Sequence, residues 1–475
     1  MKKIILSGVL LFALMDVHSQ TLIATSLDPA ATAHHNQRKI VRDSSENIFI
    51  VFTDTLNHES VIKGVKYEGS TGTWDDAAYL VHGRNPTLAI DTDGRVHMIY
   101  ESNDSLSGIM YTHSADFSSW TQPMLLSDTV PVNNTLPVAD VDSAGRVNIF
   151  WIEKNDSMSN TLMYACVLND TVLRKVSVMT KKEISDVAIA NHLLYAYNAL
   201  FFAIQFNTDS VLFFVARNDI LHFDTAYEAI GYQPCITYNS YIAEYPEYDN
   251  PVRFQYIDSS ANLMEVETYS MDWNWLHTAR LQTGIIDYIC IDDLAPPIGY
   301  GYLFMKNGNL FQGFSYGAVR GWSTIVDTIA GNPFYPSIAY KYFNFNYVDY
   351  IWMEDAGSQY NIFYNRAEKL RSLGLDDPEE NRGFTITGYP NPFSDVLTIK
   401  LAIEDMAGSP PQIKIYNQAS QLMGVLDPVA SSSGEYEFLW SGTDLRGNRV
   451  KAGIYVITCA IGNRATAKKV VFLGR

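Results

Sequence analysis

Acidic residues closely follow aromatic ones at four places in the chain, and this combination suggests carbohydrate recognition. The four segments are Phe52-Thr53-Asp54, Tyr100-Glu101, Trp151-Ile152-Glu153 and Trp352-Met353-Glu354. Aromatic rings can stack on sugar rings, while carboxylate and guanidinium groups bond to hydroxyl groups. We therefore select a candidate ligand-binding set that adds two arginines to the acids: Arg38, Asp54, Arg84, Glu101, Glu153 and Glu354. In the alternative interpretation, the rings pack in the core and the acids cap strand ends in solvent.

These residues belong to a pattern that recurs roughly every fifty residues. The segment Ile40–Phe52 aligns with Leu88–Tyr100 and with Ala139–Trp151, and each copy reads as a strand, a polar turn and a strand. Weaker copies begin near Val187, Cys235, Ile289 and Ser337. About seven such units, with six as the alternative count, predict an all-β chain containing a β-propeller. In that fold first strands start, and second strands end, at one face, which would bring the candidate set together around a central channel.

The turns inside this pattern begin with aspartate. Asp91-Thr92-Asp93-Gly94 starts as many calcium loops do, but Val96 already opens a strand where such a loop needs further oxygen ligands. Equivalent turns begin at Asp43 and Asp142, so a hairpin turn explains all three. We expect neither a metal nor a cofactor.

One outer hairpin has a more specific sequence. Ser114-Ala115-Asp116-Phe117-Ser118-Ser119-Trp120 resembles the bacterial neuraminidase repeat, or Asp-box, with Phe117 or Ser118 where the family carries glycine. The resemblance implies a sialidase-like propeller, with this turn away from the active face, and we expect Trp120 to be buried in it. A sialidase uses three arginines, a tyrosine nucleophile with a glutamate partner, and an acid/base aspartate. Arg38 looks like the family's first arginine, and the further candidates are Arg217, Arg253, Arg280 and Arg320.

The C-terminal segment carries a second resemblance. Its motif residues are Tyr389, Pro390, Asn391, Pro392, Phe393, Trp440, Gly442, Asp444, Gly447, Gly453 and Tyr455. They resemble the C-terminal sorting domain, type A, of the type IX (Por) secretion system of Bacteroidetes-type bacteria. Independently, short apolar alternations between turn clusters predict a small immunoglobulin-like β-sandwich. The alternative is a generic immunoglobulin-like or hook-capping-like module with the same Trp-x-Gly-x-Asp turn.

The N-terminus is typical of an exported protein. Lys2 and Lys3 precede an apolar run from Ile4 to Met15, and a cut after Ser19 fits a signal peptide over residues 1–19. We expect the propeller over 20–372, an acidic linker over 373–384 and the sorting domain over 385–475. No later segment reaches the roughly eighteen apolar residues of a membrane-spanning helix. The sorting resemblance implies the type IX machinery as a partner and a secreted or outer-surface location after periplasmic transit, with lipopolysaccharide attachment as an alternative to release.

Composition narrows the partners further. Lys and Arg total 34 against 52 Asp and Glu, and the net charge of −18 disfavours nucleic acid and anionic lipid. The four cysteines, Cys166, Cys235, Cys290 and Cys459, lie too far apart for a disulfide scaffold or zinc site. A Cys235–Cys290 bridge and buried free thiols remain alternatives.

These observations favour non-catalytic binding of an extracellular glycan or protein. A sialidase-like glycoside hydrolase is the alternative, and a structural role in a surface assembly is a third hypothesis. No Ser/His/Asp, phosphate-loop or H-E-x-x-H signature offers another chemistry, so the catalytic residues stay unassigned. The tyrosine-rich and acidic segment Tyr238–Pro251 is a second candidate for partner binding, since exposed aromatic residues on long loops often bind partners.

Overall fold

The structure is a computed structural model that describes residues 20–474 with interruptions. The interruptions are residues 104–107, 129–132, 143, 156–158, 192–198, 218–219, 221, 239–251, 269–275, 284, 294–299, 317–318, 321–323, 326–331, 340–346, 369–383, 392, 404–410, 418–421, 433–434, 445, 452 and 462–463. The predicted signal peptide, nearly all of the predicted linker, and the tyrosine-rich segment after Tyr238 therefore lie outside the described residues. The chain divides into two compact units, Met1–Glu368 and Lys369–Arg475.

Every regular element of the described residues is a β-strand, which confirms the predicted all-β class. That part of the chain contains no helix able to cross a membrane. The first three sheets of the first unit are β2 (Ile40–Arg42), β3 (Ile48–Leu56), β4 (Glu59–Glu68) and β5 (Thr73–Trp74), with β6 (Ala78–His82) also on β4; β7 (Arg84–Ile90), β8 (Val96–Glu101), β9 (Ile109–Ser114) and β10 (Met124–Leu125); and β11 (Asn133–Val141), β12 (Val147–Lys154), β13 (Ser159–Leu168) and β14 (Thr171–Lys182).

The next two sheets share one long strand. Their strands are β15 (Asp186–Asn191), β16 (Ala199–Phe206), β17 (Ser210–Arg217), β18 (Phe223–Tyr238), β19 (Val252–Asp258), β20 (Leu263–Thr268) and β21 (Leu276–Gln282). The first half of β18 pairs with β17 and the second half with β19, so β18 ends one sheet and begins the next. The sheet that follows contains β22 (Ile286–Asp293), β23 (Tyr300–Lys306), β24 (Asn309–Tyr316), β25 (Val319–Arg320) and β26 (Thr324–Ile325).

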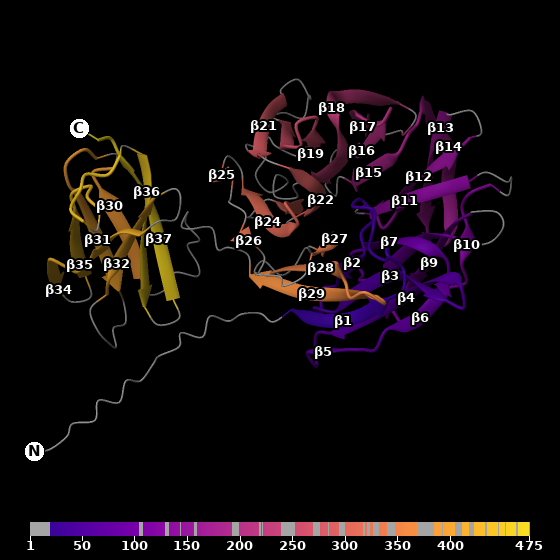
Figure 1. The fold of residues 1–475 in the computed structure, drawn as a ribbon, viewed down its shortest axis with the longest axis horizontal. Helices are drawn as coiled ribbons and strands as arrows, with labels where there is room; N and C mark the ends of the chain where they lie inside the picture. Colours follow the sequence, from indigo (N-terminus) through magenta and orange to yellow (C-terminus); the bar gives the residue numbers. More distant parts are fainter. Residues whose placement is uncertain are drawn as a thin grey trace, which may run out of the picture. The chain divides into compact units, whose positions relative to one another are not determined.

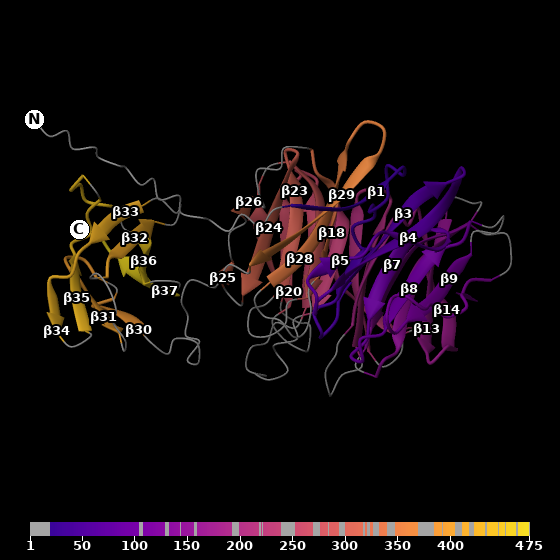
Figure 2. The ribbon, with the colours of Figure 1, turned by 90° about the horizontal axis from the view of Figure 1, so that it is seen from below.

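The last sheet joins both ends of the first unit. It contains β27 (Phe334–Ala339), β28 (Tyr347–Asp355) and β29 (Tyr360–Glu368), and its fourth strand is the N-terminal β1 (Thr21–Ser26), which pairs with β29. We call β2, β7, β11, β15, the second half of β18, β22 and β27 the first strands. Each contacts the next in chain order, and β27 contacts β2. Figure 1 shows these sheets around a common centre, and Figure 2 shows them edge on.

Apolar side chains fill the spaces between neighbouring sheets. One cluster joins Ile99 of β8 to Trp151 of β12, and another joins Phe52 of β3 to Met353 of β28. β-Branched and aromatic residues favour such strands because they pack well on a pleated surface. The aromatic members of the four sequence segments, Phe52, Tyr100, Trp151 and Trp352, are at most 2% exposed. These rings therefore pack in the core, and the idea that they stack on a sugar is wrong.

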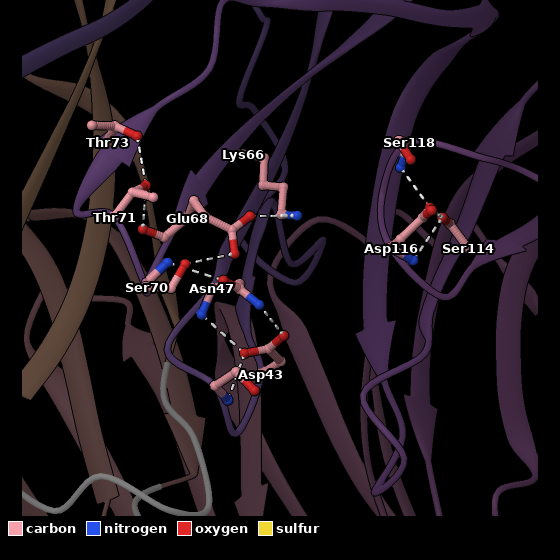
Figure 3. Close-up of polar contacts among 12 residues, drawn as sticks. Asp43, Asn47, Lys66, Glu68, Ser70, Thr71, Thr73, Ser114, Asp116 and Ser118 are labelled. Carbon is pink, nitrogen blue, oxygen red and sulfur yellow. Dashed lines mark hydrogen bonds and ion pairs between the residues drawn. The ribbon is translucent and has the colours of Figure 1, made fainter.

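The aspartate turns are hairpin turns. The Asp91 carboxylate accepts hydrogen bonds from the backbone N–H groups of Asp93 and Arg95, at 3.0 and 2.8 Å. Asp43 accepts equivalent bonds from Ser45 and Asn47, and Figure 3 shows this turn beside Glu68 and Ser70. A carboxylate that accepts two N–H groups closes the turn without help from outside the hairpin.

The Asp-box-like turn follows the same principle. Asp116 accepts hydrogen bonds from the N–H groups of Ser118 and Ser119, both at 2.9 Å, and these bonds hold the pKa of its carboxyl well below the usual range (Figure 3). Phe117, one of the two residues that can stand where the family carries glycine, adopts a left-handed conformation with φ of 64°. Its ring is buried against Phe49 of the neighbouring sheet, with centroids 4.8 Å apart. Trp120 is only partly buried, against Phe117, so our expectation of full burial is wrong.

The second unit consists of two four-stranded antiparallel sheets around one core. The sheets are β30 (Phe384–Tyr389), β31 (Leu397–Ile403), β35 (Glu435–Trp440) and β34 (Ala430–Ser432); and β33 (Leu422–Leu426), β32 (Ile413–Asn417), β36 (Gly453–Ile461) and β37 (Arg464–Phe472). Trp440 lies between Phe393 and Tyr455, with ring centroids 5.4 and 5.0 Å away. Gly442 is required beside it, because an added Cβ would lie 2.7 Å from the Phe472 ring.

Candidate functional site

The segment between β1 and β2 crosses the end of the first unit at which the first strands start. We call this end the mouth and residues 27–39 the strap. Figure 1 shows the strap, in indigo, near the centre of the first strands. The strap contacts six sheets besides the one it enters through β2. Its contact partners are Pro86 and Thr87, Pro137 and Asp140, Asp186, Pro234, Tyr288, and Tyr335 and Ser337.

The same kind of β-bulge recurs in several first strands, next to the strap. Four first strands contain a residue with positive φ followed by proline, and the strand register shifts there. The pairs are Asn85-Pro86, Leu136-Pro137, Gln233-Pro234 and Tyr335-Pro336. Bulges of this kind re-aim backbone groups that would otherwise pair with the next strand. Here they leave carbonyl groups available to the strap.

Side chains of the strap donate to three of the prolyl carbonyls. Lys39 Nζ lies 2.6 Å from the oxygen of Pro86, Gln37 Nε2 lies 3.1 Å from that of Pro137, and Asn36 Nδ2 lies 2.9 Å from that of Pro234. Thr32 completes the set by donating to the carbonyl of Tyr335 at 2.8 Å. The strap is therefore a specific occupant of the mouth, because a buried carbonyl left without a donor would be costly.

Ionisable groups accompany these neutral bonds. His35 Nε2 lies 3.0 Å from Asp186 Oδ2, and burial raises the pKa of the Asp186 carboxyl. Burial lowers the pKa of Lys39 to about 7, against the opposing negative charges of Glu101 and Asp28. Burial, followed by the charge of Lys39, lowers the pKa of His34 to about 4. The closed mouth therefore disfavours positive charge on His34 and Lys39.

Beneath the strap, the described residues line a small cavity. Its volume is about 30 Å³, and its lining includes His35, Asn36 and Arg38 of the strap and Ile236 and Ile338 of first strands. A water molecule needs at least about 10–15 Å³ by this measure, and small-molecule pockets are typically about 300–1,000 Å³. The cavity holds a few waters at most, so a sugar ring does not fit under the closed strap.

Two of the selected acids, Glu101 and Asp54, form hydrogen bonds and ion pairs within the protein. Glu101 Oε1 accepts from the Asn85 amide, the Thr135 hydroxyl and the Leu136 N–H at 2.8 to 2.9 Å, and Oε2 accepts from Arg84 Nε at 2.9 Å. Glu101 is 1% exposed, so it links the second sheet to the third rather than facing solvent.

Asp54 has a similar structural position. Its carboxylate accepts from the N–H of Leu27 at 2.7 Å and from the Ser26 hydroxyl at 3.1 Å, and it lies 2.7 Å from Lys63 Nζ. It therefore fastens the end of β1 to the first sheet. The backbone and Lys63 bonds outweigh burial and lower the pKa of the Asp54 carboxyl.

The other selected residues keep accessible side chains. Arg84 is 44% exposed beyond its bond to Glu101, and Arg38 is 25% exposed and lies 3.6 Å from Asp140. Glu153 is partly exposed, and burial, together with the nearby charge of Asp128, raises the pKa of its carboxyl. Glu354 is partly exposed and accepts from the Trp352 indole N–H at 3.0 Å.

Three of the five arginines considered for a sialidase site have described side chains, and these three lie on different elements. Arg38 lies at the mouth, Arg253 is buried on β19 and Arg280 is exposed on the outer strand β21. The side chains of Arg217 and Arg320 lie outside the described part of the chain.

A different pair of arginines, which the sequence reasoning missed, does converge. Arg42 Nη1 and Arg366 Nε each lie 2.8 Å from the carboxylate of Asp349, which also accepts from Tyr364 at 2.5 Å. Asp349 is 1% exposed. The cluster therefore joins the last sheet to the first through a buried carboxylate.

A family model matches part of the second unit. The FlgD Ig-like domain model matches residues 391–463, in agreement with an immunoglobulin-like sandwich. No curated protein matches the chain.

Comparison with solved structures concerns the fold. A PL25 ulvan lyase, solved with -[GlcA(1-4)Rha3S]- bound, is 12% identical, with 72% of this chain and 95% of that chain covered and a TM-score of 0.50. The Hadza microbial sialidase Hz136 is 9% identical, with 71% and 68% covered and a TM-score of 0.44. PorZ, a surface component of the type IX secretion system of Porphyromonas gingivalis, is 12% identical, with 92% and 59% covered and a TM-score of 0.40. At these identities the likeness concerns the fold alone.

Proposed function

We propose that the protein is exported to the cell surface or the medium and binds a glycan or a protein through a seven-bladed β-propeller. The contact of β27 with β2 and the pairing of β1 with β29 support closure of the propeller. The pairing places the N-terminal strand β1 in the last sheet, so the two ends of the first unit hold each other, as expected of a closed ring of blades.

The position of the strap supports binding at the border of the mouth, which we call the rim and which includes Arg84, Glu153 and Glu354. It fills the mouth, and Asp54 and Glu101 are already engaged, whereas Glu153 and Glu354 keep partly exposed carboxylates at the ends of second strands. A ligand at this face would therefore meet Glu153, Glu354 and Arg84 on the rim and would not enter a channel. Such a site suits a polymer, which can lie across a surface.

A double substitution tests the rim. Glu153→Gln with Glu354→Gln keeps side-chain shape and removes two charges, and each lost charged hydrogen bond is worth about 1.5–3 kcal/mol. We expect binding on a glycan array, or capture of a surface protein, to weaken at least tenfold, while Glu228→Gln on the exposed part of β18 leaves it unchanged. Equal binding by the double variant would place the site elsewhere, with the face of the Asp43 and Asp91 turns as the next candidate. Release of sugar from sialosides would instead favour a hydrolase.

We also propose that the second unit is a type IX sorting domain, with transfer to lipopolysaccharide as one outcome of export. The support is its sandwich, in which the motif residues Phe393, Trp440 and Tyr455 form one core and Asp444 closes a turn with Gly447. Deleting residues 382–475 should leave a folded first unit in the periplasm, because two units with separate cores fold separately. Normal appearance of the truncated protein at the surface would contradict the assignment.

A further inference from the structure

The strap carries five ionisable side chains, which are Asp28, His34, His35, Arg38 and Lys39. His34 lies near Glu101 of β8 and near Lys39 and His35, and Lys39 lies near Glu101 and Asp28. His35 faces Asp186 of β15, and Arg38 lies 3.6 Å from Asp140 of β11. Three further bonds are neutral, and they join the Thr32 hydroxyl and the side-chain amides of Asn36 and Gln37 to backbone carbonyls. Closure therefore combines a network that does not titrate with a few groups that do.

His34 has the position of a hinge. Its φ is 72°, in the left-handed region, and its ring packs close enough to Asn85 for a side-chain hydrogen bond. The turn that follows is closed by the N–H of Gln37, which donates to the carbonyl of His34 at 2.9 Å. Non-glycine residues in this region are held there by their surroundings, and they are frequent at switch segments.

We propose that the strap is an acid-released cover, which seals the mouth at neutral pH and lifts when His34 gains a proton. Lifting would uncover the carbonyls of Pro86, Pro137 and Pro234 and the carboxylate of Asp186. This set contains only acceptors, so it would take a ligand rich in hydrogen-bond donors, such as a cationic amine. The device is independent of binding at the rim.

The direction of the pH effect follows from the pKa of each group in the mouth. The pKa of His34 is lowered to about 4, so its neutral form supports closure above the ordinary histidine value of 6.5, and this support is lost as the pH falls to 4. The pKa of Lys39 is lowered to about 7, so its effect acts in the same direction but mostly between pH 10.5 and 7. The raised pKa of Asp186 opposes release, because the closed state then favours the protonated acid.

Hydrogen exchange of the full-length protein, followed by mass spectrometry at pH 7.5 and 5.0 and corrected for intrinsic rates, tests the proposal. For His34 alone, linkage between pKa values of 6.5 and about 4 raises the opening constant of the strap about 30-fold between these conditions. A peptide over residues 30–39 should lose protection by that order, while peptides over β12 and β13 keep theirs.

Two variants isolate the histidine. His34→Asn removes the titration and suits the backbone, since asparagine is among the residues that best tolerate positive φ, and it should abolish the 30-fold component. His82→Asn, at a side chain 56% exposed on the rim, should leave the full pH response. Equal protection of residues 30–39 at both pH values would overturn the proposal. An unchanged response in His34→Asn, or a simultaneous loss of protection in β12 and β13, would overturn it as well.

Discussion

Removal of the Glu101 carboxylate should be among the most damaging single changes in the first unit. Glu101→Ala leaves three donors without their acceptor, namely the Asn85 amide, the Thr135 hydroxyl and the Leu136 N–H. A buried donor that loses its partner costs about 1–3 kcal/mol. Because water can enter part of the space left by the side chain, we expect a total loss of about 3–6 kcal/mol in the free energy of unfolding. The exposed half of Arg84 adds little, since surface ion pairs are weak.

The matched control is Glu153→Ala, which removes the same side chain from the equivalent strand end one sheet later. Glu153 is partly exposed, so this change should cost less than about 1 kcal/mol. In Glu101→Gln the amide oxygen can still accept the three hydrogen bonds, but the amide NH2 group would face the Arg84 guanidinium, which is also a donor. This change should cost about 1–2 kcal/mol in the free energy of unfolding. Urea unfolding followed by tryptophan fluorescence measures all three. Equal losses for Glu101→Ala and Glu153→Ala would show that the Glu101 carboxylate does not join the two sheets.

Two further changes test packing at the Asp-box-like turn. Gly64→Ala should lower the free energy of unfolding by about 1–3 kcal/mol, because its Cβ would lie 2.8 Å from the Phe117 ring and 2.9 Å from Leu80. Thermal unfolding measures this loss, and an unchanged melting temperature would mean that both side chains can move aside without cost. Trp120→Ala should lower the free energy of unfolding by about 1–3 kcal/mol, because the ring is only partly buried against Phe117. A loss above 4 kcal/mol would indicate that the ring is buried more deeply than this contact implies.

The features that the sequence predicted well are local ones. The turns at Asp43, Asp91 and Asp142 are determined within five residues, since the carboxylate bonds to N–H groups just ahead of it. The hydrophobic pattern of the strands likewise reports burial directly, and it led to the all-β class. The type of the second unit was predictable for the same reason, because its turns and strands repeat these local rules.

The strap could not be predicted in this way, because its partners lie in six other sheets. A signal was nevertheless present: Pro86, Pro137, Pro234 and Pro336 fall at one position of the repeat. A proline that recurs where a strand begins indicates a recurring bulge, since proline cannot donate to the ladder. It does not indicate which segment meets the carbonyls that the bulge leaves available, because that depends on contacts distant in the sequence.

The acids show most clearly why residue type and position did not determine role. Asp54, Glu101, Glu153 and Glu354 end equivalent strands, yet the first two are engaged within the chain and the last two keep accessible oxygens. Glu101 is engaged because Thr135 and Leu136 begin a bulge beside it, and Asp54 because β1 ends there. A carboxylate at a strand end therefore becomes structural when a neighbouring segment directs backbone N–H groups toward it. Glu354 instead accepts from the Trp352 indole of its own strand and stays partly exposed. On this reasoning Glu153 and Glu354, and not the more buried acids, are the positions that we propose for ligand recognition.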